Sequence, residues 1–224
     1  MIKLENVTKF YNSKGIITHA LKNINLELYK NEFVAICGPS GSGKSTLLNV
    51  ICKQDTFDEG EIYYKGNETA YFNVDDMDDF RKNKVGFIFQ NYNIIESYTV
   101  LQNVMLPYEL KGMPTKEAKK KALAIIDEVG LHDKINNRGA ELSGGQKQRC
   151  VIARALAFEP EILACDEPTG NLDEITAAEI TQILQETAHK LNKCVIIVTH
   201  SKDVAQKADT VLELKQGILR QVKK

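Results

Sequence analysis

The sequence predicts an α/β fold in which helices cover both faces of a mostly parallel β-sheet. Two continuously apolar runs, residues 33–37 and 195–198, have the composition of strands that are buried on both faces. After Pro160, strand-like and helical segments alternate, and this order is typical of parallel sheets. The length of 224 residues allows one substantial core with a smaller satellite subdomain.

The first 90 residues contain most of the shorter predicted strands. Residues 2–7 and 24–28 alternate apolar and polar side chains, which predicts strands with one solvated face. Further strands are predicted at residues 61–64 and 85–89. Between these two strands, the acidic run at residues 75–79 lacks the ligand spacing of a calcium loop. We expect it to be a solvated turn that caps a short helix at residues 80–82.

The segment from about residue 100 to residue 158 has a helical character, so a helical insert divides the strands of the sheet in sequence. Thr115 is the expected cap of a helix over residues 116–129, and Gly130 is its expected stop. The elements predicted after Pro160 are a strand at 162–165, a helix at 176–191, a strand at 194–199 and strands near Val211 and Ile218.

Composition excludes several classes of protein. The net charge of −1 gives no overall attraction to nucleic acid, and the chain is 43% hydrophobic and 26% charged, as soluble globular proteins are. No apolar run has the length of a membrane span, and the first residues lack the apolar stretch of a signal peptide. The five cysteines form no C-x-x-C pair. We therefore expect a cytoplasmic protein with reduced thiols and no metal cluster, unless another chain holds it at a membrane.

A glycine-rich segment between an apolar strand and an apolar helix predicts a phosphate-binding loop. Its spacing is G-x-x-x-x-G-K-[ST], and inward-facing backbone N–H groups with the helix dipole form a nest for phosphate oxygens. Lys44 can reach the β- and γ-phosphates, and the Ser45 hydroxyl can ligate Mg²⁺. A flexible glycine loop rarely has this spacing. The predicted nucleoside triphosphate contacts are Gly38, Ser40, Gly41, Ser42, Gly43, Lys44, Ser45 and Thr46.

Two adjacent carboxylates follow the apolar strand at residues 162–165. Open α/β sheets place ligands at the carboxyl ends of their strands, so both side chains are expected near the bound nucleotide. Asp166 is the predicted Mg²⁺ ligand, and Glu167 is the predicted general base that polarises the attacking water. Together with the phosphate loop, this pair predicts hydrolysis rather than binding alone.

A third element, Leu-Ser-Gly-Gly-Gln at residues 142–146, opens a helix that runs to Ala157. Backbone N–H groups at the start of this helix form a second anion site, although the motif alone fits an ordinary N-cap as well. The three elements together resemble the nucleotide-binding subunit of ATP-binding cassette (ABC) transporters, in which this segment is the signature motif. The resemblance covers essentially the whole chain, and it implies that Ser143, Gly144, Gly145 and Gln146 bind ATP.

The resemblance also implies an architecture. It is a P-loop NTPase fold with a mostly parallel core sheet, an antiparallel β subdomain and a helical subdomain. The whole of residues 1–224 would then be one ABC ATPase domain. Residues 1–90 and 160–224 would form its ATP-binding core, and residues 91–159 would form the helical subdomain that carries the signature motif.

Further site residues follow from the same resemblance. Tyr11, or Phe10 beside it, matches the aromatic residue that stacks on adenine. Gln90 matches the glutamine that touches Mg²⁺ and the attacking water. Residues 170–173 match the D-loop, and His200 matches the switch histidine at the γ-phosphate. The catalytic set implied is Lys44, Gln90, Glu167 and His200, and the metal set is Ser45, Gln90 and Asp166.

The family implies a head-to-tail homodimer that traps two ATP molecules. Each site would combine Lys44 and its neighbours from one chain with Ser143 and Gly145 from the other. The resemblance further implies that a separate transmembrane permease receives the motion near residues 90–107. That partner would hold the chain at the inner face of the cell membrane, and no nucleic acid is expected as a partner.

A finer resemblance concerns the branch of the family. Residues 86–90 and 167–173 look like the MacB/LolD-like branch, which powers lipoprotein release and the export of macrolides or peptides. Two alternatives remain: a non-transport cassette of the cell-division or iron–sulfur assembly type, and a nucleic-acid or ribosome-associated cassette. A nucleotide kinase would leave residues 143–146 and His200 unexplained. The sequence does not identify the cargo.

Overall fold

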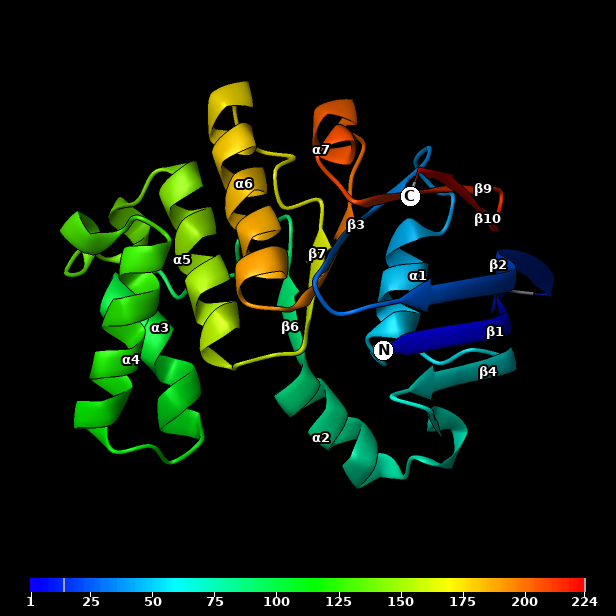
Figure 1. Ribbon diagram of the computed structural model, residues 1–224, viewed down its shortest axis with the longest axis horizontal. Coiled ribbons are helices and arrows are strands. Elements are labelled where there is room, and N and C mark those ends of the chain that lie inside the picture. Colours follow the sequence, from blue (N-terminus) through cyan, green and yellow to red (C-terminus); the bar gives the residue numbers. More distant parts are fainter. Residues whose placement is uncertain (14, 224) are drawn as a thin grey trace.

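The computed structural model describes residues 1–13 and 15–223, and its centre is a six-stranded sheet with the order β10-β9-β3-β8-β7-β6 (Figure 1). The strands from β9 to β6 are parallel, and β10 is antiparallel to β9. This arrangement confirms the predicted α/β class. Their bounds are β3 Glu32–Cys37, β6 Val85–Ile88, β7 Ile162–Asp166, β8 Cys194–Val198, β9 Thr210–Lys215 and β10 Ile218–Lys223.

The parallel sheet separates two hydrophobic cores. Along β3, Phe33 and Ala35 belong to the core that the sheet forms with the helical segment, whereas Val34 and Ile36 belong to the core on the opposite face. Successive side chains of a strand point to opposite faces, so a continuously apolar strand can fill both cores. The apolar runs in the sequence therefore mark the central strands, as predicted.

A second, antiparallel sheet has the order β2-β1-β4-β5 and carries the amino terminus (Figure 1). Its strands are β1 Ile2–Ser13, β2 Ile16–Leu28, β4 Glu59–Tyr64 and β5 Asn67–Glu68. The hairpin of β1 and β2 is longer than the predicted strands at residues 2–7 and 24–28. Register shifts interrupt the β1–β2 pairing after Leu4, Val7 and Lys9, and such bulges break the alternation on which the prediction depended.

Three helices form a block between β6 and β7 in the sequence: α3 Val100–Leu110, α4 Thr115–Glu128 and α5 Gly144–Ala157. The parallel sheet is also flanked by α1 Lys44–Ile51, α6 Glu174–Lys190 and α7 Lys202–Gln206, and short 3₁₀ turns lie at Thr69–Tyr71, His132–Lys134 and Gly139–Glu141. No helix within the described residues is long and apolar enough to cross a membrane.

The expected start of two of these helices was wrong by one or two residues. Thr115 is the first residue of α4 rather than its cap, and Pro114 occupies the cap position without a side-chain hydrogen bond. The helix predicted from Thr176 begins at Glu174, because the carboxylate of Asp173 accepts a hydrogen bond from the Thr176 N–H and caps α6 there.

The acidic run at residues 75–79 is helical, so the prediction of a turn there was wrong. It lies inside α2, Val74–Lys84. The Asn73 side chain accepts from the Asp76 N–H, and the Asp76 carboxylate accepts from the Asn73 N–H, which completes a capping box. Carboxylates in the first turn also interact favourably with the positive end of the helix dipole. This stabilisation outweighs the low helix propensity of aspartate.

One carboxylate at the start of β7 joins the two sheets. The carboxylate of Glu161 lies 3.0 Å from Lys30 between β2 and β3, 2.7 Å from Lys65 between β4 and β5, and 3.2 Å from Lys84 at the end of the helix over residues 74–84. Partial burial alone would raise the pKa of Glu161, but hydrogen bonds from these lysines outweigh it and lower the pKa to about 2. The negative form of Glu161 is therefore bound more tightly in the folded protein than in the unfolded chain.

Replacing Glu161 by Gln is expected to lower the free energy of unfolding by about 2 kcal/mol at pH 7. The full shift would correspond to about 3 kcal/mol, and partial exposure of the lysines reduces it. Because the folded pKa is depressed, this stability is present above the unfolded value of 4.5 and is lost as the pH falls towards 2. Urea denaturation at pH 7, 4 and 3 measures the free energy of unfolding. The difference between the wild type and Glu161→Gln should become smaller as the pH falls.

Glu159→Gln is a matched control, since Glu159 forms an exposed ion pair with Lys121. This substitution should lower the free energy of unfolding by at most about 0.5 kcal/mol. If the free energy of unfolding of the wild type exceeded that of Glu161→Gln by the same amount at pH 7 and at pH 3, this would contradict the role of the ionised Glu161.

Candidate functional site

The phosphate loop, residues 38–46, connects β3 to α1 at the carboxyl edge of the parallel sheet. Its backbone is forced into this path by close neighbours. A Cβ atom on Gly38 would lie 2.1 Å from the Leu214 carbonyl oxygen, and one on Gly43 would lie 2.4 Å from the Ala20 carbonyl oxygen. Both glycines also have positive φ angles, so any other residue would be strained as well as crowded.

Two polar side chains in this loop indicate that it is built to hold a ligand. Lys44 is 5% exposed, and its Nζ donates to the carbonyl oxygens of Gly38 (3.1 Å) and Pro39 (3.0 Å), which provide no negative charge. The Ser42 hydroxyl is buried without a hydrogen-bond partner among the described residues. Buried polar groups are nearly always paired, so an anion with oxygen atoms fits this loop.

The loop forms one wall of a cavity of about 810 Å³, and Tyr11 stands on another wall. Tyr11 is 43% exposed, whereas the neighbouring Phe10 ring packs against the His19 ring. The predicted site residues that line this cavity are Tyr11, Ser40, Gly41, Ser42, Gly43, Lys44, Ser45, Thr46, Glu167 and His200. An aromatic ring and a phosphate nest on one cavity match the two ends of a nucleotide.

Asp166 and Ser45 offer oxygen ligands to a divalent cation. The Ser45 hydroxyl donates to Oδ1 of Asp166 over 3.2 Å, although the two residues are far apart in sequence. Burial, followed by the charge of the neighbouring Glu167, raises the pKa of Asp166 against the opposing effects of Ser45 and Lys44. A cation would relieve this cost, and Mg²⁺ prefers oxygen ligands supplied by one or two side chains and by phosphates, so the donor set fits Mg²⁺.

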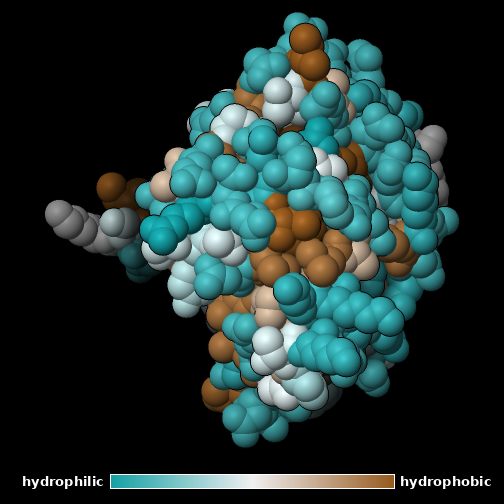
Figure 2. All heavy atoms as spheres, turned by 90° about the vertical axis from the view of Figure 1, so that its left-hand side faces the viewer, coloured by the Kyte–Doolittle hydropathy of each residue, from teal (hydrophilic) through white to brown (hydrophobic). Residues whose placement is uncertain are grey.

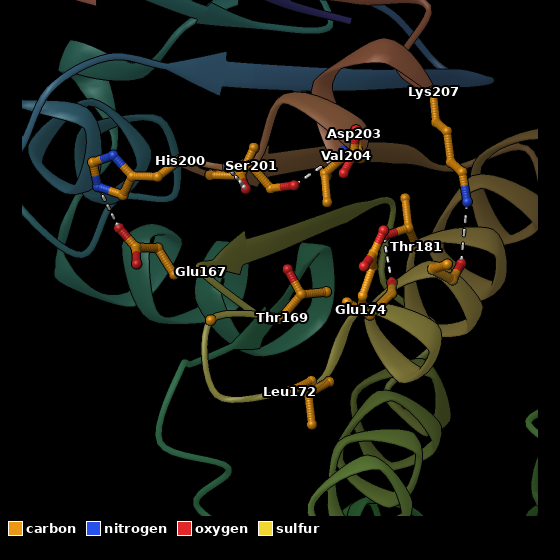
Figure 3. Close-up of a pocket in the computed structure, with 14 residues that line it drawn as sticks. Glu167, Thr169, Leu172, Glu174, Thr181, His200, Ser201, Asp203, Val204 and Lys207 are labelled. Carbon is orange, nitrogen blue, oxygen red and sulfur yellow. Dashed lines mark hydrogen bonds and ion pairs between the residues drawn. The ribbon is translucent and has the colours of Figure 1, made fainter.

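Glu167 and His200 point towards each other at one end of a neighbouring cavity of about 480 Å³ (Figure 3). Nε2 of His200 lies 2.9 Å from Oε1 of Glu167. Glu167 has a φ of +48°, and its N–H donates to the Val198 carbonyl oxygen, which ties it to β8. The parallel strands β7 and β8 end side by side, so the carboxylate and the imidazole reach the same place.

Gln90 lies next to the D-loop rather than on the wall of the phosphate-loop cavity, as far as the described residues define that wall. Its Nε2 donates to Oδ1 of Asn171 over 3.5 Å, and Nδ2 of Asn171 donates to the Gln90 carbonyl oxygen over 3.4 Å. These long, exposed bonds tie the segment after β6 to the segment after β7.

The signature segment, residues 142–146, caps α5 as predicted. The Ser143 hydroxyl accepts from the Gln146 N–H, and the Gln146 side chain accepts from the Ser143 N–H. A Cβ on Gly145 would lie 2.3 Å from Cγ2 of Thr176, so the segment packs against the start of α6. Within the described part of the chain, residues 143–146 are absent from the lining of the phosphate-loop cavity. The two predicted anion sites, the phosphate loop and the start of α5, are therefore separate within one chain.

Sequence reasoning missed part of the cavity wall. Ile17, Thr18, His19, Ala20, Lys22, Gln216 and Gly217 line it from β2 and from the turn between β9 and β10. These residues carry no local motif, because their place depends on how the two sheets pack. No signal in the sequence marked them, because the strand predicted at residues 24–28 did not include this part of β2.

Comparisons with known proteins show the family of this chain. A family model described as "ABC transporter" matches residues 21–170. The ABC transporter ATP-binding protein MJ0796 of Methanocaldococcus jannaschii is 44% identical over 221 residues, which cover 97% of this chain and 94% of the relative. The macrolide export ATP-binding/permease protein MacB of Campylobacter fetus is 44% identical over 217 residues. The match covers 97% of this chain, which spans only 34% of MacB.

Solved structures give the same family. The dimeric structure of MJ0796, an ABC transporter cassette, has a TM-score of 0.88 at 42% identity, and the match covers 100% of both chains. A dimeric post-hydrolysis structure of MJ0796 bound to ADP and Pi has a TM-score of 0.87 at 41% identity, again with 100% of both chains covered. The chain therefore belongs to the ABC transporter family, as an ATP-binding and ATP-hydrolysing cassette of the MJ0796 and MacB type.

Proposed function

We propose that this chain is the ATPase subunit that powers a separate membrane permease, in the export of a lipoprotein, a peptide or a drug. One observation carries the catalytic part of the proposal: the phosphate loop, Glu167 and His200 share one cavity, and Asp166 touches Ser45 at its edge. The similarity to MacB, a macrolide export protein, supports the direction and the class of cargo.

The separation of the two anion sites supports a composite catalytic site. Ser143 is exposed, its hydroxyl caps α5, and it lies outside the described lining of the phosphate-loop cavity of its own chain. In a head-to-tail homodimer, Ser143 and Gly145 of one chain would complete the cavity of the other, with Gly144 and Gln146 shaping that helix start. The dimeric structures of MJ0796 support this assembly.

In the proposed mechanism, ATP places its phosphates in the nest of the phosphate loop, where Lys44 leaves its carbonyl partners for the β- and γ-phosphates. Ser45, Asp166 and Gln90 would hold Mg²⁺, which neutralises charge on the phosphates. Glu167 orients and deprotonates the attacking water, and His200 donates to the γ-phosphate. The contact between Glu167 and His200 would keep both groups near the place where the attacking water meets the γ-phosphate.

The segment after β6 is the proposed contact for the permease. Phe89 and Tyr98 in this segment are 43% and 39% exposed, and Leu110 at the end of α3 is 71% exposed, which is substantial for large apolar residues. Figure 2 views the end of the molecule that carries α3 to α5, where apolar side chains interrupt a largely hydrophilic surface. The hydrogen bonds between Gln90 and Asn171 would connect a partner at this surface with the catalytic edge. Such a permease would hold the chain at the cytoplasmic face of the membrane, with residues 91–159 acting as the helical subdomain.

Glu167→Gln is expected to lower the Mg²⁺-dependent ATPase rate by about 10²–10⁴ while leaving ATP affinity within about threefold. Gln keeps the shape of the side chain but cannot accept a proton, and the phosphate nest with Lys44 remains intact. Phosphate release measures the rate, and titration calorimetry measures the affinity. Glu174→Gln is the matched control, because Glu174 is a nearby carboxylate of the smaller cavity and should be dispensable. A Glu167→Gln rate close to wild type would remove Glu167 from the role of base.

Glu167→Gln protein is expected to be monomeric alone or with ADP and dimeric with Mg-ATP, because the γ-phosphate bridges Lys44 of one chain and Ser143 of the other. Adding Ser143→Arg should prevent the dimer by steric conflict, yet ATP should still bind. Light scattering with each nucleotide measures the assembly. Thr115→Arg, an exposed change at the start of α4, is the control. A dimer that survives Ser143→Arg, or that forms equally with ADP, contradicts the composite site.

A further inference from the structure

The ring of Tyr11 is held by a carboxylate from the loop that follows α1. The Tyr11 hydroxyl donates to Oδ2 of Asp55 over 2.6 Å, across 44 residues of sequence. Partial burial, together with the hydrogen bond to Asp55, raises the pKa of Tyr11, so the phenol stays protonated and remains the donor. No motif in the sequence singles out Asp55.

A buried cation completes the support of this ring. Lys9 is 6% exposed, and its Nζ lies over the Tyr11 ring, 5.1 Å from the centroid. The same Nζ lies 3.5 Å from Oδ1 of Asp55 and 3.8 Å from Oδ2 of Asp58. The Lys9 ammonium group, which the carboxylates of Asp55 and Asp58 hold in place, therefore covers one face of the Tyr11 ring. The exposed part of the ring lines the cavity.

Backbone hydrogen bonds fix both ends of the segment from Asp55 to Asp58. The Asp55 N–H donates to Asn49 of α1, and the Asp58 N–H donates to Thr8 of β1. The Phe10 N–H donates to the Asp58 carboxylate, beside a register shift in β1 that turns the neighbouring side chains. Since α1 begins at Lys44 in the phosphate loop and ends at Ile51, it leads into the loop that holds the aromatic ring.

We propose that Asp55 is a positioning residue for ATP, which fixes the Tyr11 ring so that it stacks on the base while the phosphates occupy the loop at Lys44. The inference rests on the proposed nucleotide site. Asp55 acts through Tyr11 and touches no phosphate, so its effect is confined to the part of the ligand that carries the base. A fixed ring loses less freedom when the nucleotide binds, and this preorganisation increases affinity.

The test compares ATP hydrolysis by the wild type, Tyr11→Phe, Asp55→Ala, Asp55→Asn and the double variant Tyr11→Phe/Asp55→Ala. Tyr11→Phe and Asp55→Ala each remove the hydrogen bond between the two side chains. Each should raise KM for ATP about fivefold to tenfold and leave kcat within about twofold of the wild-type value. The double variant should be no worse than Asp55→Ala alone, because Tyr11→Phe removes a hydrogen bond that Asp55→Ala has already removed. Asp55→Asn keeps an acceptor oxygen and should stay near wild type. Asp133→Ala, an exposed aspartate paired with Lys134, is the charge-matched control.

Inorganic tripolyphosphate, which has no base, separates this role from an effect on the phosphate loop. Its inhibition constant should be the same in all five proteins. Additive losses in the double variant, an unchanged KM in Tyr11→Phe, or a parallel loss of tripolyphosphate binding would each overturn the proposal. Tyr11→Phe keeps the ring and so keeps the test valid if Asp55→Ala does not fold. Failure of the proposed function itself would appear earlier, as a wild type without ATPase activity.

Discussion

The structure depends on the parallel pairing of β3, β8 and β7. In this pairing Ile36 lies beside Val198, and Val198 lies beside Asp166, so the three strands end at one edge of the sheet. The connections that leave this edge carry the phosphate loop, Glu167 and His200. Backbone ladders thus bring together groups that are more than 100 residues apart, and the two cores on the faces of the sheet hold these strands rigid.

The cavity at the phosphate loop contains only one of the two predicted anion sites, as far as the described residues define its wall. Lys44, Asp166, Glu167 and His200 come from one edge of the sheet, whereas the signature segment faces elsewhere, beside α6 and the segment after β7. In the proposed homodimer a second copy would close the site, and ATP would then link the two surfaces. Under the same proposal, loss of the γ-phosphate would remove the contact between the two chains and so allow them to separate.

Local patterns predicted the parts of the site that local geometry determines. The phosphate loop, the carboxylates after β7 and the Ser143 cap each depend on a few consecutive residues, and the structure places them as the sequence indicates. The long β1–β2 hairpin, the helix over residues 74–84 and the support of Tyr11 by Asp55 could not be read in this way. Bulges hide strand periodicity, a capping box overrides low propensity, and the contact of Asp55 with Tyr11 exists only through tertiary packing.

The most direct test of the composite site is complementation between two inactive variants. In a mixed dimer of Lys44→Ala and Ser143→Ala chains, which adds no bulk to the interface, one site combines an intact Lys44 with an intact Ser143, and the other site has neither. The account predicts that mixing the two proteins restores ATPase activity to about a quarter of the wild-type rate, since half of the dimers are mixed and each has one site. Activity no higher than the mean of the separate variants would contradict a site shared between two chains.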